Sequence, residues 1–186
     1  MFFYAMPDFW LALMMMMIFA YWIPLFPVAG ALDPVMHEYM TPLAAFADRL
    51  KHLALPAVTL ALLTGAAVAR YQRVELLRVL PDDFVRTARA KGVSERRIML
   101  IHVLRNALIP TISLLGLSLP ALFTGAVFIE RVFAWPGMGT LAITAVRGRD
   151  YPVIMAVNLV TAVLILLANL LADCLYAVAD PRIKYA

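Results

Sequence analysis

The stretch Asn106–Ile129, NALIPTISLLGLSLPALFTGAVFI, holds 24 consecutive residues without an Asp, Glu, Lys or Arg. A helix that crosses the hydrocarbon core of a bilayer needs about 20 mostly apolar residues, at a rise of about 1.5 Å each. Three more charge-free intervals are of comparable length: Phe9–Leu32 with 24 residues, His52–Ala69 with 18 and Tyr151–Ala172 with 22. We therefore expect four transmembrane helices, at about residues 9–28, 52–71, 106–129 and 151–173.

The overall composition also indicates a membrane protein. Of the 186 residues, 64% are apolar and 15% are charged, and the mean hydropathy is +0.86, whereas soluble domains are about 45–50% apolar and about 25% charged. This composition excludes a soluble globule, a disordered linker and a nucleic-acid-binding protein. A soluble protein that buried all four intervals would need a larger core than this chain can enclose, and the intervals lack the alternation of membrane barrels. The expected fold class is all-α, a polytopic membrane protein surrounded by lipid.

Prolines lie in or near the first three expected spans. Pro24 and Pro27 should end the first span, because proline cannot continue the hydrogen-bond ladder of a helix. Pro56 in the second span, and Pro110 and Pro120 in the third, predict bends or local unwinding. Inside a bilayer the freed carbonyl groups need neighbouring helices or water, so we expect these spans to pack against other helices.

The charges between the second and third spans predict the orientation. From Arg70 to Arg105 the chain carries nine Arg and Lys residues against four Asp and Glu residues. By the positive-inside rule this segment, about residues 72–105, is a cytoplasmic loop. With four spans, both termini are then cytoplasmic, and the segments Asp33–Lys51 and Glu130–Asp150 face outward.

The cytoplasmic loop has an ordered sequence pattern. A need for positive charge to keep the loop in the cytoplasm does not explain this pattern. Asp82 is expected to cap a short helix over Asp83–Lys91, and Gly92 occupies the position where helices end in a left-handed residue. Ser94 can cap a second helix that runs into the third span. At helical spacing the apolar face of the short helix combines Phe84, Val85 and Ala88, whereas Arg86 and Arg89 share another face. A short helix with an apolar stripe is suited to docking in a groove of another protein.

This loop resembles a known family. The run Phe84–Pro110, FVRTARAKGVSERRIMLIHVLRNALIP, is similar to the cytoplasmic loop of ATP-binding-cassette importer permeases, in particular the first permease subunit of the dipeptide, oligopeptide and nickel group. Further similarities follow in order along the chain: Gly125–Phe133 (GAVFIERVF), Trp135–Gly139 (WPGMG), Arg149–Pro152 (RDYP) and Asp180–Arg182 (DPR). Any one of these matches is weak, but together they are specific.

The resemblance implies a coupling role for the loop. In the family this element, called the EAA loop, sits in a groove of a separate ATPase subunit, and here it would comprise Phe84, Arg86, Thr87, Ala88, Arg89, Ala90, Lys91 and Gly92. The wider family writes Glu-Ala-Ala, three residues, then Gly, but counting back from Gly92 gives Arg86-Thr87-Ala88. The Glu and the first Ala are absent, so a contact specific to that Glu does not carry over. The implied partners are ATPase subunits, a second permease subunit and an extracytoplasmic substrate-binding protein, in a bacterial or archaeal inner membrane.

The resemblance covers only part of the family's usual length. Family members usually have six spans, and the four expected here align with the last four. The chain is therefore expected to be a partial type-1 transmembrane domain over residues 1–186. It is either a working permease subunit or a truncated or inactive fragment of one.

Other candidate chemistry is sparse. The three histidines, His37, His52 and His102, show no metal-ligand spacing, so no metal site is expected, and the chain has no phosphate-binding loop of the GxxxxGK[ST] type. We expect no cofactor and no enzyme activity, with ATP hydrolysis in a partner subunit. Glu130, at the outer end of the third span, is either functional or close enough to the boundary to reach water.

The turn Trp135-Pro136-Gly137 is expected on the external face, with Trp135 at the depth that aromatic residues prefer. It is either a simple re-entry turn or lies where a binding protein docks. The rival to a permease is a free-standing four-helix membrane scaffold or intramembrane hydrolase, but the spans lack a recognisable catalytic constellation. The sequence leaves the solute open, since dipeptide, oligopeptide, nickel and glutathione importers share this loop.

Overall fold

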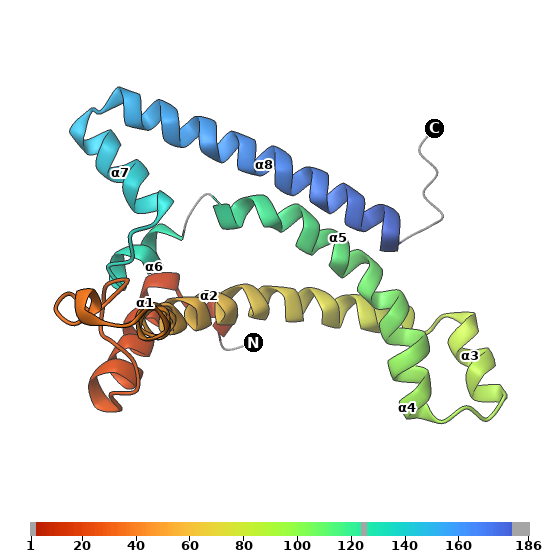
Figure 1. The fold of residues 1–186 in the computed structure, drawn as a ribbon. Helices are drawn as coiled ribbons and strands as arrows, with labels where there is room; N and C mark the ends of the chain where they lie inside the picture. Colours follow the sequence, from red (N-terminus) through yellow and green to blue (C-terminus); the bar gives the residue numbers. More distant parts are fainter. Residues whose placement is uncertain (1–2, 124–125, 180–186) are drawn as a thin grey trace. The chain divides into compact units, whose positions relative to one another are not determined.

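The computed structural model describes residues 3–123 and 126–179, and within them it contains helices and no strand (Figure 1). This confirms the predicted all-α class. The α-helices are α1 (Asp8–Met16), α2 (Pro42–Val79), α3 (Asp83–Ala90), α4 (Glu95–Arg97), α5 (Leu104–Phe123), α6 (Val127–Val132), α7 (Met138–Gly148) and α8 (Tyr151–Ala179). Short 3₁₀ helices, η1 (Phe3–Ala5) and η3 (His37–Tyr39), and π-helical segments, η2 (Met17–Trp22) and η4 (Ile98–Val103), complete the list.

Two of these helices are long and apolar enough to cross a membrane. They are α2, which contains the predicted span 52–71, and α8, which begins at the predicted position Tyr151. The first helical stretch, α1 with η2, covers Asp8–Trp22 and ends before Pro24, which makes it shorter than the predicted 9–28. The predicted span 106–129 is divided between α5 and α6, and residues 124–125 between them lie outside the described residues.

The apolar side chains of α8 lie mostly on its surface. Met155, Leu159 and Leu166 expose 71%, 68% and 68% of their area. A helix in the core of a soluble protein would bury such side chains, because each exposed apolar Å² costs about 25 cal/mol in water. This exposure therefore supports contact with lipid or with further membrane helices.

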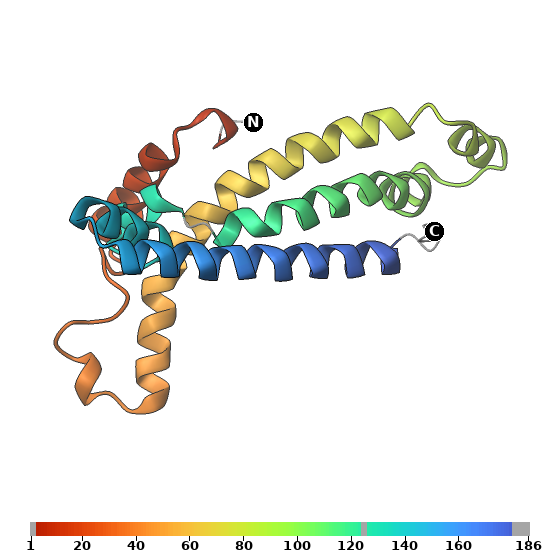
Figure 2. The same ribbon diagram turned by 90° about the horizontal axis from the view of Figure 1, so that it is seen from above.

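Pro56 lies inside α2, and it is accompanied by a bend. Figure 2 shows the orange first part of α2 at a steep angle to its golden continuation. Proline has no amide hydrogen, so a carbonyl group one turn earlier is left without its helical hydrogen bond. In addition, the Thr59 hydroxyl donates a hydrogen bond to the Leu55 carbonyl at 2.8 Å. Such hydrogen bonds from a side chain to the preceding turn also bend helices. At Pro110, by contrast, the predicted unwinding is absent, since α5 runs through this position as a regular helix. The irregular turn lies earlier, in the π-helical segment η4.

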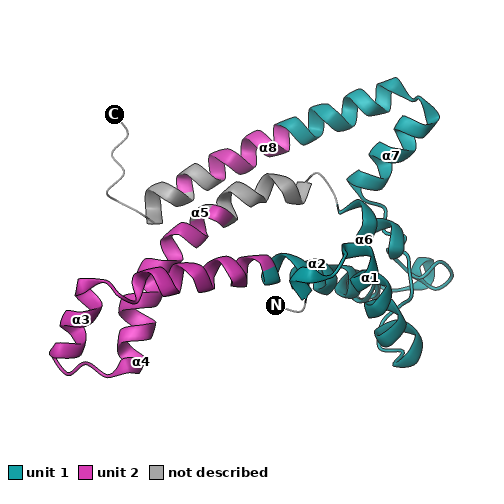
Figure 3. Ribbon diagram, turned by 180° about the vertical axis from the view of Figure 1, so that it is seen from behind, with its two compact units in different colours: residues 1–66, 122–162 teal, residues 67–121, 163–186 magenta. Residues whose placement is uncertain are grey.

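The chain divides into two compact units, residues 1–66 with 122–162, and residues 67–121 with 163–186 (Figure 3). In the first unit α1 packs on α6, and the rings of Phe9 and Phe128 lie 6.4 Å apart. Phe133 is 1% exposed, and its carbonyl accepts a hydrogen bond from the Gly30 amide at 2.8 Å. The buried core of this unit consists of Ala12, Ala20, Leu55, Ile129 and Phe133.

The second unit contains a helical hairpin in which α3 packs against η4, the continuation of α4 (Figure 1). Its buried core consists of Val85, Ala88, Ile98 and Val103, with Leu76, Val79, Leu80, Val93 and Met99 around them. Farther along the same unit, the Gln72 amide donates to the Ala107 carbonyl at 3.2 Å and its oxygen accepts from the Thr111 hydroxyl. This polar contact joins α2 to α5, as expected of helices that pack in a membrane.

We expect Val85→Ala to weaken the hairpin, because Val85 is 0% exposed and the substitution leaves a cavity in the core. The cost should be about 1–3 kcal/mol. The measurement is protease cleavage within residues 80–95 in membranes. The matched control is Val74→Ala, since Val74 on α2 is 56% exposed. Equal cleavage rates in the two variants would contradict the packing role.

Candidate functional site

The helix α3 begins and ends close to the predicted positions. Asp82 stands at the N-cap with extended backbone (φ −62°, ψ 149°), although its side chain makes no capping hydrogen bond. At the other end the Val93 amide donates to the Ala88 carbonyl at 3.2 Å and the Gly92 amide to the Arg89 carbonyl at 2.9 Å. This pair of bonds is a Schellman motif, which requires a left-handed residue after the helix. Gly92 supplies it with φ +74°, as predicted.

An ion pair closes the turn between the two helices of the hairpin. The guanidinium of Arg89 donates to both carboxylate oxygens of Glu95, at 2.7 and 3.3 Å. The hydrogen bond from Arg89 lowers the pKa of the Glu95 carboxyl, and the same bond raises the pKa of the Arg89 guanidinium. Ser94 holds the N-cap position of α4, so the second helix starts where the sequence indicates. The end of α3 is thus tied to the start of the helix that continues into α5.

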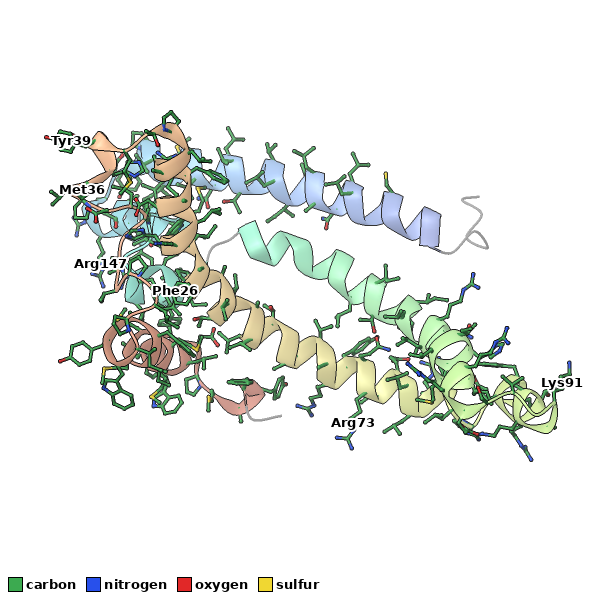
Figure 4. The ribbon with its side chains drawn as sticks, turned by 60° about the horizontal axis from the view of Figure 1, so that its bottom comes forward. Phe26, Met36, Tyr39, Arg73, Lys91 and Arg147 are labelled. Carbon is green, nitrogen blue, oxygen red and sulfur yellow. The ribbon has the colours of Figure 1, made fainter. Side chains whose placement is uncertain are left out.

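The apolar stripe of α3 is divided between two environments. Val85 and Ala88 are buried against the same chain, so they are not available for docking in a partner, contrary to the expectation for the whole stripe. Helical spacing shows that a face is apolar but not which surface covers it. The exposed remainder of the predicted coupling residues is Phe84, Arg86, Thr87, Arg89, Ala90, Lys91 and Gly92. Phe84 is 39% exposed, an apolar side chain in a basic surface, and Figure 4 shows Lys91 at the tip of the hairpin, pointing away from it.

A second local arrangement surrounds the predicted external turn. Glu130 on α6 is 8% exposed, and one of its oxygens accepts from the Thr140 amide and the Thr140 hydroxyl, both at 2.6 Å. The other oxygen accepts from the Gly139 amide at 3.4 Å. Glu130 therefore caps the N-terminus of α7, where a negative charge also stabilises the helix dipole. Of the two alternatives that the sequence left open for Glu130, access to water does not fit its 8% exposure, and no sequence signal marked the capping role.

Two glycines leave the space that Glu130 occupies. A Cβ atom on Gly137 would lie 2.2 Å from Cδ of Glu130, and one on Gly139 would lie 2.5 Å from Cγ2 of Val127. The backbone before them turns sharply, with the Trp135 amide bonded to the Glu130 carbonyl at 2.7 Å and Ala134 at φ +48°. The turn Trp135-Pro136-Gly137 is therefore held from α6 rather than being a loose connection.

Two of the three histidines meet one carboxylate. Asp48 accepts from Nδ1 of His37 at 2.9 Å and lies 3.2 Å from Nδ1 of His52, and it also accepts from the Asp33 amide at 2.9 Å. The Asp33 carboxylate in turn accepts from the amides of Val35 and Met36. Within the described residues no group of three or more His, Cys, Asp or Glu side chains is arranged to hold a metal. This cluster instead fixes the loop over residues 33–48.

The loop should be sensitive to strong acid. The hydrogen bond from the Met36 amide lowers the pKa of the Asp33 carboxyl below 3.8. The hydrogen bond from the Asp33 amide lowers the pKa of the Asp48 carboxyl in the same way. A carboxyl with a depressed pKa stabilises the folded loop above its unfolded pKa, and this contribution is lost as the pH falls through the folded pKa. We expect hydrogen-exchange protection over residues 33–40 to be constant from pH 7 to 5 and to fall below about pH 4. Asp48→Asn should lower the protection at neutral pH, whereas the exposed control Glu38→Gln should not.

The chain is similar to a family of transport proteins over nearly its whole length. Residues 1–185 match the family described as "Binding-protein-dependent transport system inner membrane component". The chain belongs to this family. Its relatives include the oligopeptide transport system permease protein AppB of Bacillus subtilis, which is 44% identical over 181 residues. The di/tripeptide permease DppB of Pseudomonas aeruginosa and the dipeptide permease DppB of Escherichia coli K12 are 41% and 38% identical.

The alignments cover nearly all of this chain but little more than half of each relative. They include 97–98% of the chain and 55%, 58% and 58% of the three relatives. Membership of the inner membrane component family confirms the resemblance found in the loop and in the segments that follow it. The family is described as inner membrane components of binding-protein-dependent transport systems. The family does not by itself assign a role to α3 or to the Glu130 turn.

Proposed function

We propose that the chain is a permease subunit of an ATP-driven importer that moves peptides or related small solutes. The three relatives described above have names that refer to peptide transport. The family is described as inner membrane components. Dipeptides or oligopeptides are the proposed solutes, and the solute itself would be selected by a separate binding protein. The second permease subunit and the ATPase subunits complete the proposed assembly.

The contact with the ATPase would be made by the outer face of α3. The observation that carries this proposal is the division of that helix: Val85 and Ala88 anchor it to the chain's own core, while Phe84, Arg86, Thr87 and Lys91 are exposed. A partly exposed aromatic anchor among cations suits a groove that has an apolar pocket and an acidic rim. Closure of two ATPase subunits would then move α3 and change the accessible side of the solute path.

The capture of the ATPase subunit by the membrane-inserted chain tests this contact. The assay uses the chain together with its companion permease and ATPase subunits, purified through a tag on the chain. Phe84→Ala should reduce the recovered ATPase about ten-fold, whereas Tyr39→Ala, an aromatic residue that is 83% exposed in the 33–40 loop, should not. Equal recovery with Phe84→Ala and wild type would refute the proposed contact. Absence of any ATPase with the wild-type chain would instead favour a free-standing scaffold.

The proposed topology has four spans with both termini in the cytoplasm, supported by the nine-to-four excess of positive charge between Arg70 and Arg105. Cys174 is the single cysteine, so Cys174→Ser gives a background for labelling with an impermeant thiol reagent. Ser94→Cys should be protected in intact cells and react after lysis, and Arg147→Cys should react in intact cells. Reaction of Ser94→Cys in intact cells would reverse the proposed topology.

A further inference from the structure

An open groove runs along one face of the helix that leads from the hairpin into α5. It has a volume of about 300 Å³ and is lined by Leu100, Leu104, Arg105, Leu108, Ile109 and Ile112. A second hollow of about 350 Å³, lined by Ser94, Arg96, Arg97, Leu100 and Ile101, adjoins it at Leu100. The aliphatic residues at positions 100, 104, 108 and 112 recur every four residues, so they form one stripe along the helix.

Three arginines beside this groove have no ion-pair partner within the described residues. Among the described residues, Arg78, Arg86 and Arg89 have carboxylate partners, but no such ion pair includes Arg96, Arg97 or Arg105. All three are exposed, and the nearby Glu95 carboxylate is already engaged by Arg89. The hairpin end of the groove is therefore cationic, Arg105 adds a charge about midway along it, and the remaining lining is aliphatic.

The stripe runs from the proposed cytoplasmic loop into the proposed third span. Twelve residues separate Leu100 from Ile112, which gives about 18 Å at about 1.5 Å per residue, so Leu100 and Leu104 lie at the level of the headgroups and Leu108 and Ile112 lie in the span, which starts at residue 106. Leu100 and Ile101 expose 56% and 49% of their area, so this face is open to an occupant. Basic residues just cytoplasmic of a membrane helix attract anionic headgroups, and guanidinium groups bind phosphate through paired hydrogen bonds.

We propose that this groove binds an anionic phospholipid, with its phosphate on Arg97, Arg96 and Arg105 and one acyl chain along Leu104, Leu108 and Ile112. The site rests on the proposed membrane topology but not on ATPase binding. A free phosphate would use only the cationic end and leave the aliphatic stripe uncovered. A helix of a partner protein has no need of three unpaired cations beside that stripe.

Native mass spectrometry of the full chain tests the site. The chain is released from nanodiscs that contain equal amounts of phosphatidylglycerol and phosphatidylcholine, and the retained lipids are counted. The wild-type chain should retain phosphatidylglycerol at least five-fold more often. Arg97→Gln/Arg105→Gln should lose this preference, Arg97→Lys/Arg105→Lys should keep part of it, and the charge-matched control Arg73→Gln/Arg78→Gln should keep all of it.

Three outcomes would overturn the proposal. The first is an unchanged lipid preference in Arg97→Gln/Arg105→Gln. The second is displacement of the lipid by 10 mM inorganic phosphate. The third is loss of the lipid when the companion permease binds, which would show that the groove is a protein contact. Labelling of Ser94→Cys in each variant checks that insertion is intact. ATPase capture is measured on the same preparations, so a wrong coupling assignment and a wrong lipid site give separate results.

Discussion

Gly92→Val should weaken coupling to the ATPase about ten-fold while leaving membrane insertion intact. Gly92 has φ +74°, a region that a β-branched residue rarely adopts. A Cβ at this position would meet no atom within 4 Å, so the penalty arises from the backbone alone and amounts to about 1–2 kcal/mol or more. The Schellman motif would open, and the exposed face of α3 would no longer be aimed at its partner. ATPase capture and solute uptake should each fall about ten-fold, since about 1.4 kcal/mol corresponds to that factor.

Two control variants separate backbone strain from side-chain size. Gly92→Asn should keep most of the coupling, because asparagine tolerates the left-handed region. Gly65→Val in α2 should have little effect, as a Cβ there also meets nothing within 4 Å and no positive φ is required. Wild-type coupling in Gly92→Val would mean that residues 84–92 serve only as a charged anchor, and the proposed role of α3 would fall.

Gly137→Ala should destabilise the first unit more than its size suggests. The new methyl group would lie 2.2 Å from Cδ and 2.3 Å from Oε1 of Glu130. The carboxylate would have to leave its three donors on Gly139 and Thr140, and hydrogen bonds to a charged group contribute about 1.5–3 kcal/mol each. A loss of about 2–4 kcal/mol should lower the melting temperature of the purified chain by about 5–10 °C. Gly148→Ala is the matched control on the same helix, because its Cβ meets nothing within 4 Å.

The clash with Glu130 can be tested by a double-mutant cycle. Glu130→Ala alone should remove the cap of α7 and lower the melting temperature by a similar amount. Since the clash requires the Glu130 side chain, Glu130→Ala/Gly137→Ala should be no less stable than Glu130→Ala. Additive effects of the two substitutions would show that Gly137 is needed for another reason.

The helix α3 could be predicted almost residue by residue, because its signals are local. Asp82, Gly92 and Ser94 mark helix ends through the conformations that their own side chains allow. The all-α class follows as directly from the charge-free intervals. The π-helical segment Ile98–Val103, in contrast, lies in an ordinary helical pattern and has no residue that marks it.

The contacts that join distant residues could not be predicted. Glu130 meets Thr140 only because the chain turns at Ala134, where a non-glycine residue takes φ +48°. His37 meets Asp48 because the loop folds back onto α2, whereas the contact of His52 with Asp48 is a local i,i+4 pair on that helix. Val85 and Ala88 are buried because they pack against η4, and the periodicity of α3 alone does not show which surface covers them.

The two buried cores differ in when they can form during synthesis. The core beneath α3 uses residues 76–103 only, so its contacts are local and can form within microseconds to milliseconds once this segment has left the ribosome. The core of the first unit joins Ala12 and Leu55 to Ile129 and Phe133, so it must wait until position 133 has been synthesised, several seconds later at about 5–20 residues per second. The hairpin of α3 and η4 can therefore be complete before the first unit has its final contacts.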